Sequence, residues 1–251
     1  MTPLCALQVM PDTAPSALSF SLQAWSAWSP DLTTPAAWAD WAATDTRQTQ
    51  SIEPAVAAMP AMLRRRAQRL GRMALETLYD PATAVSADYP IVFASRYGEV
   101  QRSTALLQEL AENGAVSPQS FSMSVHNAIA GLYTIATTQA ANVVALAAGT
   151  QTACGGLVEA LMLLADGAPG VRLLFCDEPL PSVYDRYGET ATPAFACLLV
   201  LQAGADFQLH WQDNAAATDA APLDLLRFIL TDAATLALST SGWGIQRAAA
   251  Q

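Results

Sequence analysis

The chain contains no lysine. All of its 12 basic residues are arginine, and they are outnumbered by 22 acidic residues, so the formal net charge is -10. Mechanisms that form a Schiff base on lysine are therefore excluded. The acidic balance also argues against nucleic acid or an anionic membrane as a partner, because both are bound by clustered cations.

Histidine and cysteine are scarce. His126 and His210 are the 2 histidines, and their separation rules out a helical pair of zinc ligands, so we expect no metal and no other cofactor. The 4 cysteines include no CxxC pair. Cys176 and Cys197 lie within apolar runs, which predicts reduced thiols in the core of the protein.

Long apolar segments are missing as well. No run reaches the roughly 20 residues that span a bilayer, and the N-terminus lacks the basic and apolar regions of a secretory signal. We therefore expect a cytoplasmic protein. With 251 residues, 52% of them hydrophobic and 14% charged, the chain can fold as a single domain, 1–251, and can bury large surfaces in its core or against a partner.

Apolar runs alternate with helical patterns along the chain. A 3.6-residue spacing of apolar residues predicts a helix over 59–79, and an amphipathic stretch predicts one over 100–113. The segment 152–165 is apolar nearly all round, which predicts a helix buried on most sides, and we expect a terminal helix over 222–238. Uninterrupted apolar runs predict buried strands over 90–95, 143–148, 171–176 and 195–202, with further candidates at 18–25 and 207–211. This alternation predicts an α/β fold, with helices layered around a mixed or mostly parallel sheet.

The most informative stretch runs from Ser117 to Glu159. It resembles the N-terminal half of the β-ketoacyl synthases, the condensing enzymes of fatty acid and polyketide synthesis, at Ser117-Pro118, Asn127, Ala130-Gly131 and Ile135. The resemblance covers about residues 55–205. Within the family, the chain resembles the chain length factor subunits of type II polyketide synthases, and most of all the short ketosynthase-like subunit of aryl polyene biosynthesis.

This resemblance implies a thiolase-like fold, of which the chain would hold the N-terminal half. It also implies a heterodimer with a catalytic β-ketoacyl synthase, joined through the strand over 143–148. The chain would complete the partner's dimer and shape its acyl tunnel. An acyl carrier protein is the second partner that the resemblance implies.

The family's catalytic cysteine falls on Thr150 when residues are counted from Ser117-Pro118. Threonine has no accessible anion at neutral pH, so we expect Thr150 to cap the following helix, a role that Thr152 could share, and the subunit to be non-catalytic. Neither His126 nor His210 matches a catalytic histidine of the family. Two readings of Cys154 stay open: a small buried thiol, or the nucleophile of an active β-ketoacyl synthase or acyltransferase.

Two further groups of residues follow from the resemblance. Candidates for the acyl tunnel and the subunit interface are Phe121, Met123, His126, Asn127, Leu132, Tyr133, Val143, Val144 and Leu146. For His126 and Asn127 the alternative is a structural role with local hydrogen bonds. Candidates for docking an acidic carrier protein are Arg64, Arg65, Arg66, Arg69 and Arg72. The alternative for these arginines is a solvated helix face with internal pairs such as Arg72–Glu76.

Overall fold

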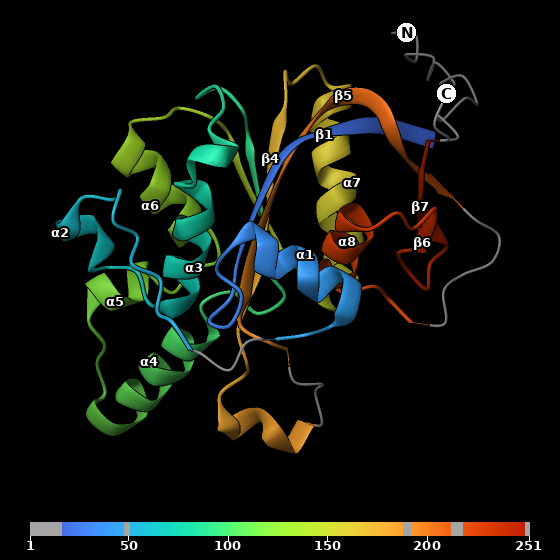
Figure 1. Cartoon of the computed structure of the whole chain (residues 1–251). Coiled ribbons are helices and arrows are strands. Elements are labelled where there is room, and N and C mark those ends of the chain that lie inside the picture. Colours follow the sequence, from blue (N-terminus) through green and yellow to red (C-terminus); the bar gives the residue numbers. More distant parts are fainter. Residues whose placement is uncertain (1–16, 48–50, 188–191, 212–217, 249–251) are drawn as a thin grey trace, which may run out of the picture.

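A mixed β-sheet lies at the centre of the protein and carries helices on both faces (Figure 1). The computed structural model describes residues 17–47, 51–187, 192–211 and 218–248, so Cys5 lies outside the described residues. Within these ranges the strands follow the order β3-β2-β4-β5-β7-β6, and β1 pairs with β5. Their bounds are β1 Ala17–Trp28, β2 Ile91–Ala94, β3 Val143–Leu146, β4 Val171–Asp177, β5 Phe195–Trp211, β6 Thr235–Ala237 and β7 Trp243–Arg247.

Parallel and antiparallel pairs divide the sheet. β2 runs parallel to both β3 and β4, whereas β5 is antiparallel to β1, β4 and β7. The predicted strands over 195–202 and 207–211 are one long strand, β5. One edge of β5 pairs with β1, while its other edge pairs first with β4 and then with β7. β3 therefore forms the outer edge of the parallel part of the sheet.

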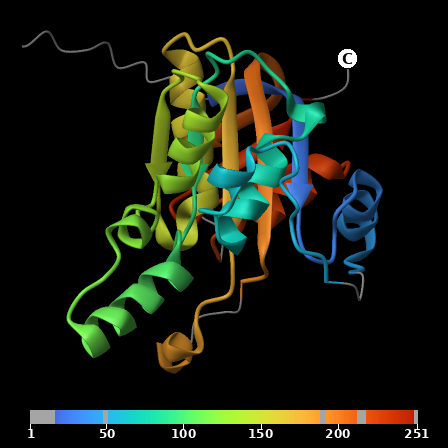
Figure 2. The same ribbon diagram turned by 90° about the vertical axis from the view of Figure 1, so that its left-hand side faces the viewer.

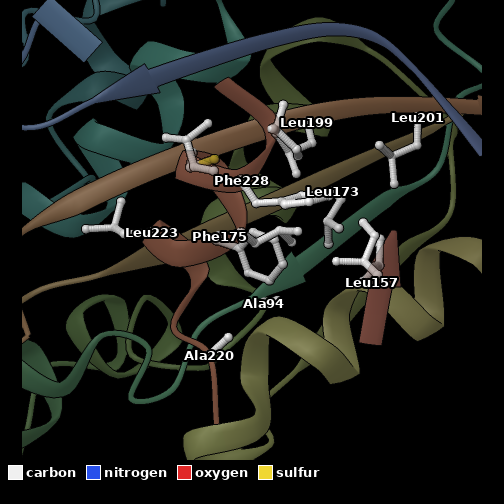
Figure 3. Close-up of a cluster of buried hydrophobic side chains, with 14 of the residues drawn as sticks. Ala94, Leu157, Leu173, Phe175, Leu199, Leu201, Ala220, Leu223 and Phe228 are labelled. Atoms are coloured by element: carbon white, nitrogen blue, oxygen red, sulfur yellow. The ribbon is translucent and has the colours of Figure 1, made fainter. Parts of the chain in front are cut away.

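Two layers of helices cover the sheet. α3 (Arg69–Leu78) and α6 (Ala128–Thr137) pack on one face, and α1 (Pro35–Thr44), α7 (Thr152–Ala165) and α8 (Pro222–Leu230) pack on the other. Side chains of α7, α8 and the central strands meet in the cluster drawn in Figure 3, which includes Leu157, Phe175 and Phe228. α4 (Val100–Asn113) and α5 (Pro118–Ser122) project from this body (Figure 2).

The prediction of one helix over 59–79 is wrong. The structure has a short helix, α2 (Ala61–Arg64), and then α3, with a non-helical segment between them. Arginine side chains satisfy the backbone carbonyls at this break. Arg102 Nη2 donates to Arg66 O (2.8 Å), and Arg72 Nε donates to Ala67 O (3.3 Å). The break is stable because these carbonyls exchange a helical partner for a guanidinium.

The terminal helix predicted over 222–238 is also too long, because α8 ends at Leu230 and two strands follow. Arg247 of β7 explains the end of the helix: its Nη2 donates to Phe228 O (3.0 Å) and to Thr231 O (2.7 Å). A guanidinium at a helix C-terminus satisfies the last carbonyls and complements the helix dipole. α1 was not predicted, although Thr34-Pro35 is a regular helix start, with Thr34 accepting from Ala37 N–H at 3.2 Å.

Gly156 brings α7 close to the sheet. A Cβ atom at this position would lie 2.7 Å from Phe175 Cε1 and 3.1 Å from Ala94 Cβ, and both neighbours are fully buried. We therefore expect Gly156→Ala to lower the free energy of unfolding by about 1–3 kcal/mol, measured by urea denaturation. Gly131→Ala is the matched control, because Gly131 has open space around it in α6. This variant should gain about 0.5–1 kcal/mol. Equal stability of the two variants would contradict the close packing of α7.

Candidate functional site

The expected nucleophile position lies in the turn between β3 and α7. Thr150 is exposed there, within the 3-10 turn Gly149–Gln151, and its hydroxyl donates to Asp219 Oδ2 at 2.6 Å. The predicted N-cap role of Thr150 is wrong. Thr152 at the start of α7 makes the local contacts instead: its Oγ1 donates to Gly149 O (2.8 Å) and accepts from Ala148 N–H (3.2 Å). Asp219 comes from a segment 69 residues later and was not predicted.

Cys154 lies in the first turn of α7 and is only 4% exposed. Burial raises the pKa of its thiol, and a hydrogen bond with Ser239 opposes this effect, while the negative charge of Asp219 adds to it. A thiolate at a helix N-terminus is normally stabilised by the helix dipole, but here the net effect favours the neutral thiol. These features favour the buried-thiol reading of Cys154.

Each histidine has a ring nitrogen within hydrogen-bond distance of a backbone carbonyl. His126 Nε2 contacts Leu146 O at 3.0 Å, and its ring stands edge-on to Phe93 with the centroids 5.8 Å apart. His210 lies within β5, with Nδ1 3.4 Å from Gln208 O. His126 therefore joins the α5–α6 connection to the end of β3, which agrees with its structural alternative.

A cavity of about 280 Å³ lies beside Thr150, at the carboxyl ends of β2 and β4. Its lining includes Arg96, Thr150, Asp177, Phe195, Asp219 and Leu223, but neither Cys154 nor a histidine. The carboxylate of Asp177 is hydrogen-bonded to the turn after β2: it accepts from Ser95 Oγ (2.8 Å) and from Arg96 N–H (3.0 Å). The cavity therefore offers no cysteine and histidine pair of the kind that condensation uses. A larger cavity, about 510 Å³, lies between β1 and residues 52–58 and contains none of the predicted site residues.

The predicted tunnel and interface residues fall into two sets. Met123, Leu132 and Tyr133 are buried in the chain's own core. The accessible set consists of exposed or half-buried residues: Phe121, His126, Asn127, Val143, Val144 and Leu146. Phe121 is 59% exposed, and the exposed apolar side chains Leu107, Leu110, Val125 and Ile135 were not predicted. The sequence did not separate the two sets, because apolar side chains occur in both and their burial depends on how α5, α6 and β3 pack.

The arginines predicted to dock a carrier protein differ in their surroundings. Arg64 Nη1 donates to Val56 O (3.1 Å), and Arg69 Nε lies 3.6 Å from Glu53 Oε1. The expected pair Arg72–Glu76 is absent from the described residues, because Glu76 Oε2 instead accepts from Val56 N–H at 2.6 Å. Arg65 and Arg66 are exposed and form no ion pair within the described ranges.

A buried acidic pair was not predicted. Glu99 precedes α4 and is 3% exposed, with Arg102 Nε 3.5 Å from its Oε2. Glu178 follows β4 and is 6% exposed. Burial and the neighbouring Glu99 raise the pKa of Glu178 to about 7, although Arg69 opposes this. Acidic residues directly after a buried strand, as in Asp177-Glu178, are the signal that could have pointed to this pair.

No helix in the described ranges is long and apolar enough to cross a membrane. The same residues include no cluster of three or more side chains suited to hold a metal ion.

The match to a family model identifies the class of protein to which the chain belongs. The model described as "Beta-ketoacyl synthase, N-terminal domain" matches residues 38–241. The chain belongs to the β-ketoacyl synthase family, and its fold is the thiolase-like fold, which confirms the resemblance and the fold class predicted from the sequence. No curated protein matched the chain.

Solved structures support the same assignment. The chain is similar to a chain of the ketosynthase ApeO in complex with its chain length factor ApeC from Xenorhabdus doucetiae, with a TM-score of 0.77 and 26% identity over 92% of this chain and 100% of that chain. The ishigamide ketosynthase/chain length factor matches with a TM-score of 0.60 and 16% identity, over 78% of this chain and 68% of that chain.

A third structure contains AntDE and AntF, a type II polyketide synthase acyl carrier protein in complex with its ketosynthase bound to the hexaketide. It matches with a TM-score of 0.61 and 13% identity, over 78% of this chain and 70% of that chain. At this identity the similarity establishes the shared fold.

The buried Glu178 predicts how stability depends on pH. Its pKa is about 7 in the folded protein, above its ordinary value of 4.5, so the folded chain holds more protons than the unfolded chain between these values. The free energy of unfolding should therefore fall by about 1–3 kcal/mol from pH 5 to pH 8. Urea denaturation at several pH values measures this slope.

Two variants assign the slope to one carboxyl group. Glu178→Gln keeps the shape of a protonated Glu178 and should flatten the dependence. Glu112→Gln removes an exposed carboxylate at the end of α4 and should leave the dependence as in the wild type. An unchanged slope in Glu178→Gln would show that Glu178 is ionised throughout this range.

Proposed function

We propose that this protein is a non-catalytic, chain length factor subunit that pairs with a catalytic β-ketoacyl synthase. The observation that carries the proposal is Thr150 at the family's nucleophile position, with its hydroxyl held by the Asp219 carboxylate. Burial opposes the effect, but hydrogen bonds from Thr150 and Thr240 lower the pKa of Asp219, so this carboxylate is a weak base for the hydroxyl. The buried Cys154, with its raised pKa, gives no support to the alternative of an active synthase or acyltransferase.

The proposed interface with the synthase includes the edge strand β3. Ile91 N–H donates to Asn142 O (2.9 Å) and Ser95 N–H donates to Leu146 O (3.2 Å), so the even-numbered residues of β3 face β2. The backbone groups of Val143 and Ala145 therefore point to the open edge of the sheet. An open edge with free N–H and C=O groups pairs readily with a strand from another chain.

Exposed apolar side chains on α5 and α6 support the same partner. Phe121 in α5 and Ile135 in α6 are both exposed, although they are large and hydrophobic. Contiguous exposed apolar surface is typical of a protein interface. The matched structures include complexes of a ketosynthase with a chain length factor, which supports a ketosynthase as the occupant.

The proposed contribution of this subunit is to shape the acyl tunnel of the synthase. Phe121, His126, Val144 and Leu146 are the accessible candidates for contact with the acyl chain or the partner. Met123, Leu132 and Tyr133 would act indirectly, because they fix the position of α6 against the core. The proposed product class is an aryl polyene or a related polyketide, and the cytoplasm is the proposed location.

A proline in β3 tests the pairing. Ala145→Pro removes the N–H group that points outward and leaves the hydrogen bonds to β2 in place, so the chain should fold but fail to pair. Co-expression with the synthase, followed by size exclusion with mass measurement, should give a 1:1 complex for the wild type and separate chains for Ala145→Pro.

Ala145→Val is the control at the same position, because it retains the N–H group and suits a strand. It should form the complex as the wild type does. A proline variant that assembles normally would contradict pairing through β3. A wild-type chain that stays monomeric beside the synthase would remove the proposed function.

Arg65 and Arg66 are the proposed contacts for an acidic acyl carrier protein. Their exposed guanidinium groups can attract an acidic partner over a distance, and salt screens this attraction. Arg65→Glu and Arg66→Glu should each weaken carrier binding to the complex by about three- to tenfold at low salt, with a smaller effect at high salt. Affinity titrations at two salt concentrations measure this.

Arg186→Glu makes the same change of charge in the distant turn 182–187 and serves as the control. Its affinity for the carrier should stay near that of the wild type. If all three reversals weaken binding equally, the effect comes from net charge, and the basic segment at 64–66 is an ordinary helix surface.

A further inference from the structure

The start of α7 contacts two segments from the C-terminal part of the chain. The first contains Asp219 and Ala220, and the second is the turn Leu238–Trp243, which leads into β7. The two segments are joined by a hydrogen bond from Ala220 N–H to Leu238 O (2.9 Å). Figure 3 shows Ala220 directed toward the cluster that α7 and α8 share. The segments 219–220 and 238–243 therefore form one unit over the N-terminal end of α7.

The carboxylate of Asp219 links this unit to the turn Gly149–Gln151, which contains Thr150. Asp219 Oδ2 accepts from Thr150 Oγ1 (2.6 Å), and Asp219 Oδ1 accepts from Thr240 N–H (2.8 Å) and Thr240 Oγ1 (3.0 Å). Gln151 Nε2 adds a contact to Thr240 Oγ1 at 3.3 Å. Although partial burial opposes it, these hydrogen bonds lower the pKa of Asp219, so the carboxylate is ionised at neutral pH.

The same unit covers Cys154. Cys154 shares one buried cluster with Ala220 and Leu238, and the neighbouring Ser239 is fully buried and lowers the pKa of the thiol, against the larger effect of burial. The Ser239 hydroxyl also lies 2.7 Å from Ser241 Oγ and accepts from Trp243 N–H at 3.4 Å. The turn is thus held over the thiol by polar contacts, of which those of Asp219 and Thr240 lie at the surface of the protein.

The hydrogen bonds of Asp219 and Thr240 lie at the surface, whereas the side chains below them pack in an apolar core. The core at α8 is apolar and includes Leu223, Leu226 and Phe228. Surface hydrogen bonds compete with water and open locally at a lower free energy than a packed core does. Loss of the Asp219 contacts should therefore loosen the cover without unfolding α8.

We propose that residues 219–220 and 238–243 form a clasp that fixes the turn at Thr150 and covers Cys154. Asp219 holds Thr150 and Thr240 together, and the turn at Ser239 seals Cys154 from thiol reagents and acyl donors. The clasp keeps acyl groups from transferring to this chain, so the acyl chain remains on the partner's nucleophile. The cover over Cys154 is a property of this chain alone, whereas its consequence for the partner's nucleophile rests on the proposed function.

Iodoacetamide labelling with peptide mass mapping tests the clasp in the full chain. A Cys5→Ser background leaves three thiols, of which Cys176 and Cys197 are buried within the sheet and report global unfolding. In the wild type, Cys154 should label slowly. In Asp219→Ala its labelling should rise by about ten- to a hundredfold, because hydrogen bonds to a charged group are lost, while Cys176 and Cys197 stay protected.

Two further variants complete the test. Thr240→Val removes only one of the hydroxyl contacts with Asp219 and should give a smaller increase at Cys154. Asp232→Ala removes an exposed carboxylate from the same C-terminal region and should match the wild type. Fast labelling of Cys154 in the wild type, or an unchanged rate in Asp219→Ala, would overturn the clasp. Labelling of all three thiols in both clasp variants would also overturn it, because these contacts would then hold the whole fold.

Discussion

Burial of the central strands on both faces is the constraint on which the rest of the structure depends. All seven residues of β4 are buried, as are all four of β2 and the first seven of β5. Strands of this kind are stable only between two layers of helices, which explains why α3 and α6 lie on one face and α1, α7 and α8 on the other. Even Arg172 in β4 is buried, where it is held by Tyr89 O (2.7 Å) and Gln139 Oε1 (2.9 Å).

The edge strand β3 and the start of α7 differ in the contacts that they make within the chain. At the edge of the sheet, β3 lacks a second neighbouring strand in the described residues, and exposed apolar side chains lie nearby. At the start of α7, Asp219 from the C-terminal part of the chain holds the hydroxyl of Thr150 and the backbone N–H of Thr240. An open sheet edge together with a hydrogen-bonded Thr150 is the combination that the proposed supporting subunit requires.

Much of the fold could be predicted from the sequence, because its strongest signals are local. Continuous apolar runs identified β2, β3, β4 and the first part of β5. The bounds predicted for the amphipathic helix α4 and for the apolar helix α7 agree with the structure. The failures have tertiary causes. Arg102 stabilises the break after α2, and Arg247 ends α8, although both arginines are remote in sequence from the residues that they cap.

The candidate site was harder to predict than the fold. Counting along the sequence assigned the family's nucleophile position to Thr150, which lies in the turn before α7, but no local motif indicates its partner Asp219. Burial of Met123, Leu132 and Tyr133, in contrast with exposure of Phe121, likewise depends on how α5 and α6 pack. The pairing of Glu76 with Val56 N–H rather than with Arg72 has the same origin.

The central claim is that this subunit supports condensation without taking part in bond formation. The most direct measurement is the condensation rate of the assembled complex with Cys154→Ala in this chain, beside a complex in which the partner's nucleophile is replaced. The account predicts a rate within about threefold of the wild type for Cys154→Ala and loss of condensation for the partner variant. A loss of more than about a hundredfold in Cys154→Ala, with the complex intact, would contradict it.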